Sequence, residues 1–177
     1  ASDSENKYAT GLSLGSGVAL TGTSKIDTQG TLNQTGNALD IAIEGAGYFQ
    51  LQKPDGTIAY SRAGNFSLTA EGTVVSSEGL PLIPQIQIPE GATNVSIGND
   101  GTVSATIQGE AAATEVGKIE TARFVNPAGL QSIGANLLVE TAASGTPQVG
   151  VPGLEGRGSV RSGSLEGSNV NVVEELV

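Results

Sequence analysis

Few side chains in this chain of 177 residues could carry out chemistry. The sequence contains no cysteine and no histidine, which excludes thiolate nucleophiles, disulfides, imidazole–zinc sites and histidine-based catalytic triads. A serine nucleophile could then be activated only by a lysine. The neighbouring carboxylates, Asp40 with Glu44 and Glu174 with Glu175, form no pair that the sequence places face to face. We therefore predict that the protein is not an enzyme.

Two motifs partly match ligand-binding loops without completing them. Gly45-Ala46-Gly47 follows an expected strand, as a dinucleotide fingerprint does, but Gln50 occupies the place of the third glycine and no helical pattern follows. The run Asn-Asp-Gly at 99–101 is too short for a calcium loop and is typical of a hairpin turn. The sequence thus predicts no cofactor, no metal site and no small-molecule substrate.

The net charge of the chain makes some classes of binding partner unfavourable. The chain carries 18 acidic and 8 basic residues, which give a net charge of −10. Such a charge disfavours binding to nucleic acid and to anionic membrane surfaces, and it keeps free copies apart in solution. No apolar run approaches the roughly 18 residues that a transmembrane helix needs. These features favour a protein that assembles with other proteins.

The apolar pattern predicts an all-β protein with a single domain of short antiparallel strands. Runs rich in Val, Ile, Leu and Thr are interrupted about every 8–12 residues by Gly, Pro, Asn or Asp. The stretch 80–89 contains three prolines and should form sheet edges or irregular extended chain, because proline lacks a backbone donor. The expected strands cover 39–43, 48–51, 103–107, 117–125, 137–141 and 159–165, with shorter ones near 60, 66–68 and 74–75.

One local pattern recurs along the chain and predicts hairpin turns. A polar residue is followed by Gly-Thr and then by an aliphatic residue at 29–32, 55–58, 71–74 and 100–103. Glycine adopts the positive φ that such a turn needs, and the β-branched threonine begins the returning strand. We therefore expect a turn at each of these glycines.

The last ten residues predict the beginning of a helix. Asn171 can cap the first free amides, and Glu174 follows three residues later, as in a capping box. Val170, Val173 and Val177 are spaced like the seam of a helix that packs on another helix. Because about two turns of helix are not stable alone in water, we expect that a longer helix has been removed. The alternative is a frayed polar tail.

The first part of the chain predicts an extended arm. Leu12, Leu14, Val18 and Leu20 recur in a stretch of low charge, a pattern that suits a strand laid on another surface. The arm, from residue 8 to about residue 35, either reaches a neighbouring copy or forms an edge strand within its own chain, and both possibilities stay open.

The predicted organisation therefore has three parts, and the core can be compact or elongated. Residues 1–35 form the arm, residues 36–167 form the β core, and residues 168–177 begin the helix.

Several motifs, taken together, resemble the bacterial flagellar rod and hook proteins, a family of axial proteins. The resemblance runs in order from about Gly11 to Val177, and residues 11–18 and 29–35 are most similar to the subfamily of the distal rod. The motifs lie at 40–49, 60–66, 72–74, 79–82, 132–137, 140–147 and 168–176.

The resemblance implies a structural subunit that polymerises helically into a rigid hollow shaft, which carries torque from the motor to the hook. Such a shaft crosses the periplasm and the outer membrane. The implied partners are further copies of the chain, the proximal rod and hook proteins, and the outer ring that serves as a bushing. Family members leave the cell through the flagellar export apparatus without a cleaved secretory signal.

Members of this family carry a helix at each end, and the two helices pair in an inner tube. The present sequence lacks the first helix and almost all of the second, which implies a core fragment that is monomeric by itself. We also expect the two ends of the β core to lie close together, because both continue into one layer of paired helices.

Three alternatives stay open. A proximal rod or hook subunit shares most of these motifs. A β-rich surface adhesin or a phage-tail fibre domain would also be rich in Gly, Thr and Asn, but it would show clearer repeats and bind a host ligand. A polysaccharide-cleaving enzyme would turn over glycans.

Overall fold

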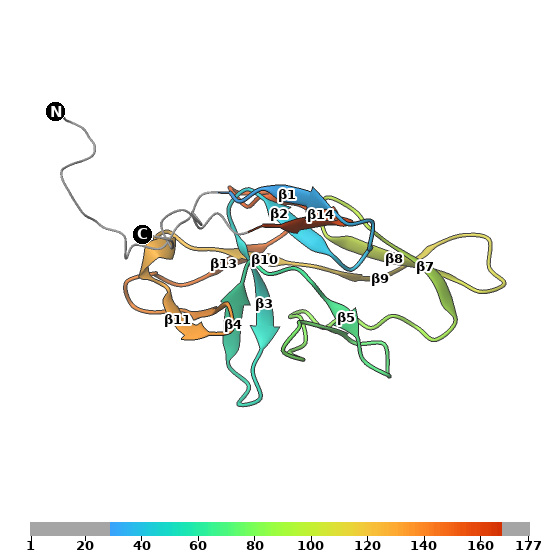
Figure 1. Ribbon diagram of the computed structural model, residues 1–177, viewed down its shortest axis with the longest axis horizontal. Coiled ribbons are helices and arrows are strands. Elements are labelled where there is room, and N and C mark those ends of the chain that lie inside the picture. Colours follow the sequence, from blue (N-terminus) through green and yellow to red (C-terminus); the bar gives the residue numbers. More distant parts are fainter. Residues whose placement is uncertain (1–28, 168–177) are drawn as a thin grey trace, which may run out of the picture.

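The computed structural model describes residues 29–167, which form short antiparallel strands and one 3-10 turn, η1 (Pro127–Gly129) (Figure 1). The predicted all-β fold class is confirmed. Within this part of the chain, no helix is long and apolar enough to span a membrane.

Six strands form the largest sheet, and all its neighbouring pairs are antiparallel. In spatial order they are β11 (Gln131–Gly134), β12 (Leu137–Val139), β4 (Ile58–Ser61), β3 (Tyr48–Gln52), β10 (Thr121–Arg123) and β13 (Gln148–Gly150). Strands β11 and β13 are therefore the two edges of this sheet.

The remaining strands form smaller sheets around it. The sheet of β7, β8 and β9 lies at one end of the long axis of the molecule, with β4 and β11 toward the other (Figure 1). Its strands are β7 (Ala92–Ile97), β8 (Thr102–Ile107) and β9 (Thr114–Lys118). The two-stranded pairs are β2 (Ile41–Glu44) with β14 (Ser159–Ser162), β1 (Leu32–Gln34) with β15 (Ser164–Glu166), and β5 (Ser67–Leu68) with β6 (Val74–Val75).

Apolar side chains cover both faces of the central strand β3 and its neighbours. On one face, Phe49 and Leu51 are fully buried, and the Phe49 ring meets Phe66 edge to face with centroids 5.0 Å apart. On the other face, Tyr60 packs edge to face on Phe124, with centroids 4.9 Å apart. Because successive side chains of a strand point to opposite faces, the alternation of Phe49 and Leu51 with Gln50 places the apolar pair on one face and the buried Gln50 on the other.

The predicted turns form at three of the four glycines. Gly56, Gly72 and Gly101 have φ of 87°, 90° and 86°, and each donates its N–H to the carbonyl three residues earlier. The expectation at Gly30 is wrong, since Gly30 has no positive φ and leads directly into β1. A side chain is excluded there for another reason, because a Cβ on Gly30 would overlap the carbonyl oxygen of Gly167.

Two predicted strands are in fact interrupted. The stretch 117–125 divides into the end of β9 and β10, because residues 119–120 carry the chain from the three-stranded sheet to the six-stranded sheet. The stretch 159–165 divides into β14 and β15, because Gly163, with φ of 80°, redirects the chain from β2 to β1. By contrast, the stretch 80–89 forms only isolated bridges, as its prolines predicted.

The two ends of the described chain lie side by side, as predicted. Strands β1 and β15 pair in the register Leu32 with Glu166 and Gln34 with Ser164. Just beyond this pair, the Gly167 N–H donates to the Thr31 carbonyl oxygen at 2.6 Å. Residues 29–35 of the predicted arm therefore pair within their own chain, while the predicted boundary at residue 35 stays a prediction.

Candidate functional site: the junction of the two chain ends

A polar cluster ties the two ends of the β core to its centre. It consists of Gln29 before β1, Arg62 after β4, Glu166 at the end of β15, and the backbone of Ile43 in β2 and of Gly45 and Gly47 in the turn to β3. We call this cluster the end clamp. It joins residues that are more than a hundred positions apart in the sequence.

Arg62 uses every N–H of its guanidinium group in the end clamp. Its Nε and Nη2 donate to the two carboxylate oxygens of Glu166, at 3.0 and 2.9 Å. Nη1 donates to the carbonyl oxygens of Gly45 and Gly47 at 2.6 and 2.9 Å, and Nη2 donates also to that of Ile43 at 3.1 Å. Two parallel bonds from a planar guanidinium to a carboxylate fix direction as well as distance.

Glu166 brings the N-terminal segment into the same cluster. Its Oε2 also accepts from the Gln29 side-chain amide at 2.6 Å and from the Gly30 N–H at 2.8 Å. In return, the Gln29 side-chain oxygen accepts from the Gly45 N–H at 2.8 Å. The Glu166 side chain is only 10% exposed, so these bonds are partly shielded from water.

The glycines of the motif at 45–47 provide the backbone shape that the end clamp needs. Gly45 and Gly47 have φ of 123° and 128°, which other residues rarely adopt. Their conformation directs two carbonyl oxygens toward Arg62. A Cβ on Gly45 would also lie 2.8 Å from the Cα of Gly158. The glycine motif at 45–47 therefore binds Arg62 of its own chain.

A second arginine is buried at the edge strand β13. The Arg157 side chain is 3% exposed and donates to the carbonyl oxygens of Val151 at 3.1 Å and Gln148 at 3.3 Å. Its Nη2 also donates to Glu155 at 2.6 Å, but the Glu155 side chain is 79% exposed. Gly150 makes room for the guanidinium group, since a Cβ there would overlap it. Arg157 thus donates hydrogen bonds to carbonyl oxygens at the edge strand β13. Without these bonds, the edge would be more open to pairing with another strand.

The substitution Arg157→Met should lower the free energy of unfolding by about 1–2 kcal/mol, because it removes a buried charged donor from two partly buried carbonyl oxygens. It should also favour self-association through β13. Urea unfolding and light scattering measure the two effects. The control Glu155→Gln removes only the exposed ion pair and should cost less than about 1 kcal/mol. A monomeric Arg157→Met variant with unchanged stability would contradict this role.

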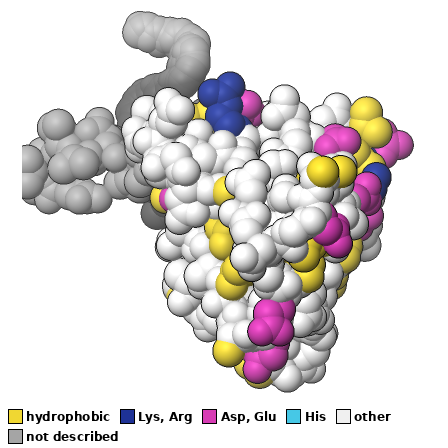
Figure 2. Space-filling model, turned by 90° about the vertical axis from the view of Figure 1, so that its right-hand side faces the viewer, with side chains coloured by type: hydrophobic (Ala, Val, Ile, Leu, Met, Phe, Trp, Pro, Cys, Tyr) yellow, Lys and Arg dark blue, Asp and Glu magenta, His cyan; other side chains and the backbone are white. Residues whose placement is uncertain are grey.

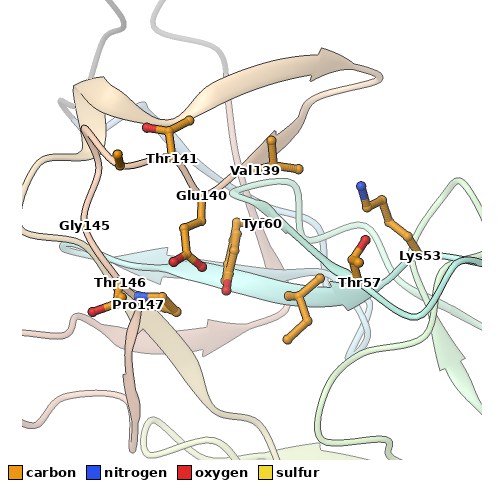
Figure 3. Close-up of a pocket in the computed structure, with 11 residues that line it drawn as sticks. Lys53, Thr57, Tyr60, Val139, Glu140, Thr141, Gly145, Thr146 and Pro147 are labelled. Carbon is orange, nitrogen blue, oxygen red and sulfur yellow. The ribbon is translucent and has the colours of Figure 1, made fainter.

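A depression of about 790 Å³ lies between β4 and residues 139–147. Figure 3 shows the side chains that line it. Its polar side chains include Lys53, Tyr60 and Glu140. Burial raises the pKa of the Tyr60 phenol, and the charge of Glu140 raises it further. Glycoside hydrolysis usually needs a pair of carboxyl groups, and Glu140 is the only one that lines this depression. The depression therefore gives no support to the alternative of a polysaccharide-cleaving enzyme.

Acidic side chains are spread over the end of the molecule formed by β7, β8 and β9 (Figure 2). Glu90, Glu110 and Glu115, on or beside these strands, are all exposed. Among residues 29–167, no group of three or more acidic, histidine or cysteine side chains could hold a metal ion. This end presents dispersed negative charge.

The side chains predicted to contact other subunits lie outside the described residues. They are Leu12, Leu14, Val18, Leu20, Val170, Val173 and Val177. Their roles stay predictions. The residues of the end clamp were not predicted as a site, although Arg62 and the glycines at 45 and 47 lie within motifs that the sequence singled out.

Comparison with known proteins gives consistent matches. Residues 42–105 match the family described as the flagellar hook protein FlgE/F/G D1 domain. A flagellar basal-body rod protein FlgG from Buchnera aphidicola subsp. Acyrthosiphon pisum is 47% identical over 173 residues, which cover 98% of this chain and 66% of the relative. The FlgG of Buchnera aphidicola subsp. Baizongia pistaciae is 40% identical, with 99% and 68% covered. A flagellar basal-body rod protein FlgF from Caulobacter vibrioides is 34% identical, with 90% and 61% covered. The chain spans about two thirds of the length of these relatives.

Proposed function

Because this chain belongs to the family of flagellar basal-body rod proteins FlgG, we propose that it is the β core of a subunit that polymerises helically into the distal rod. In this function the assembled rod carries torque from the motor to the hook, and the chain itself catalyses no reaction. The observation that carries the proposal is the match to relatives named FlgG along 98–99% of the chain, at higher identity than to the FlgF relative.

The junction of the chain ends supports this function. A subunit whose terminal segments pair with each other needs a core from which both segments leave at one place. In the β core, residues 29–31 and 166–167 lie side by side and are held by the end clamp. The proposed seam of the paired layer includes Val170, Val173 and Val177, and the proposed arm contacts include Leu12, Leu14, Val18 and Leu20.

The proposed partners are further copies of the chain, the proximal rod and hook proteins, and an outer ring around the shaft. The proposed location is the part of the basal body that crosses the periplasm and the outer membrane, reached through the flagellar export apparatus. The dispersed acidic charge of the β7–β9 end supports a surface that stays soluble before assembly and does not stick to a surrounding ring.

Deleting the gene of the full-length protein tests the proposal. Electron microscopy of basal bodies should show that the proximal rod forms and that the structure stops before the distal rod and hook. A strain that regains the gene should form complete flagella. Basal bodies with a complete rod but no hook would instead assign the protein to the hook, and normal swimming flagella would contradict the proposed function.

Deleting the segment of the full-length protein that corresponds to residues 8–28 of this chain tests the proposed arm. Loss of contacts between neighbouring copies should give rods that are shorter, or that bend more than normal rods in electron micrographs. Rods of normal length and stiffness would contradict the role of the arm, while leaving the function of the β core untouched.

A further inference from the structure

We propose that the end clamp is a mechanical latch, which resists separation of the two chain ends. Separation is the motion that would detach the terminal segments from the β core. The latch acts because the strands at the chain ends are loaded in one direction and Arg62, Gln29 and Glu166 lie at the point where that load arrives.

Strands β1 and β15 meet in a geometry that is weak without such a latch. They are antiparallel, with Leu32 opposite Glu166 and Gln34 opposite Ser164. The chain therefore enters β1 and leaves β15 at the same end of the pair. Pulling the two chain ends apart loads the backbone hydrogen bonds one after another, beginning with the bond from Gly167 to Thr31. A pair of such short strands, loaded in this way, opens like a zipper.

The end clamp lies where this zipper begins to open. Before β1 can leave β15, Glu166 must release both Gln29 and Gly30, to which it is bonded at 2.6 and 2.8 Å. Glu166 is itself fixed by two bonds from Arg62, which is anchored to the carbonyls of Gly45 and Gly47. The first contacts to be loaded are thus charge-assisted hydrogen bonds, which are about twice as strong as neutral ones.

A second ion pair of the β core provides a matched comparison. Arg161 on β14 and Glu44 on β2 approach to 3.1 Å, but their side chains are 55% and 34% exposed. This pair joins two other strands and does not contact Gln29 or Gly30. Loss of its charge should therefore have little effect on opening of the chain ends.

That rod subunits experience such a load rests on the proposed function, whereas the latch itself is a property of the isolated chain. The chain has no cysteine, so two introduced cysteines provide the only attachment points for pulling in optical tweezers. One double variant carries Ala1→Cys and Val177→Cys and loads the chain ends. A second double variant carries Asp55→Cys and Ala112→Cys, in exposed turns away from the junction.

Glu166→Gln should raise the rate of opening about tenfold or more at a given force when the protein is pulled by its ends. When it is pulled through residues 55 and 112, the rate should change by less than about twofold. Glu44→Gln should change neither rate by more than about twofold. Equal effects of Glu166→Gln in both directions would show general destabilisation and overturn the proposal, as would an unchanged rate in end-to-end pulling. Neither result bears on whether the full-length protein builds a rod.

Discussion

Replacing Gly64 with alanine should lower the free energy of unfolding by more than about 4 kcal/mol or prevent folding altogether. The Ile41 N–H donates to the Gly64 carbonyl oxygen at 2.9 Å, and a Cβ on Gly64 would overlap the carbonyl oxygen of Ile41. Neither backbone can retreat easily, because Ile41 is 1% exposed and Phe66, two residues after Gly64, is 4% exposed. An effect of this size is rare for a single substitution and is expected only where a specific packing constraint is broken.

Urea unfolding followed by circular dichroism measures this effect, with Gly56→Ala as the control. Gly56 has φ of 87° but no atom within 4 Å of the position of a Cβ, so its substitution carries only the conformational cost of about 1–2 kcal/mol. If Gly64→Ala is no more destabilising than Gly56→Ala, the close backbone contact with β2 does not exist in solution.

Replacing Arg62 with leucine should lower the free energy of unfolding by about 3 kcal/mol, measured in the same way. The substitution leaves the partly buried Glu166 carboxylate without its charged donor, and it removes the arginine N–H donors from the carbonyls of Gly45 and Gly47. Arg161→Leu removes an arginine from the exposed pair with Glu44 and should cost about 0–1 kcal/mol. Equal costs for the two substitutions would contradict the structural role of the end clamp.

Local sequence patterns predicted much of the β core. The strands expected at 39–43, 48–51 and 103–107 correspond to β2, β3 and β8 within one or two residues. The turns at Gly56, Gly72 and Gly101 formed because the requirement for positive φ is local. Where one predicted strand proved to be two, the cause was a change of partner strand. At 119–120 and at Gly163 the chain leaves one sheet for another. The spacing of apolar residues does not indicate which sheet a strand joins.

The end clamp could not be predicted from such patterns. Arg62 and Glu166 are separated by 104 positions, and no local spacing relates them. Two signals were nevertheless present, since a lone arginine after an apolar strand and a Gly-x-Gly turn both lay in motifs of the first half of the chain. Recognising their purpose required the observation that β15 returns to β1, which places Glu166 within reach of both.

The same geometry suits the proposed role of the β core in a rod. Its sheets bury apolar side chains on both faces of β3, while its two ends are tied together and to the strand β4 through Arg62. Force that enters through the terminal segments would then reach the core at one anchored point.

The most direct test is to ask whether the ends stay together in the assembled rod. The full-length protein would carry Gln34→Cys and Ser164→Cys, at paired positions that lie between hydrogen-bonded pairs of β1 and β15. Such positions have Cα atoms about 4.5 Å apart, within the range that a disulfide spans. After oxidation of purified basal bodies, gel electrophoresis without reductant should show nearly all rod subunits as internally cross-linked monomers. Subunits that remain as free thiols, or that cross-link to their neighbours, would show that the two ends separate or exchange on assembly.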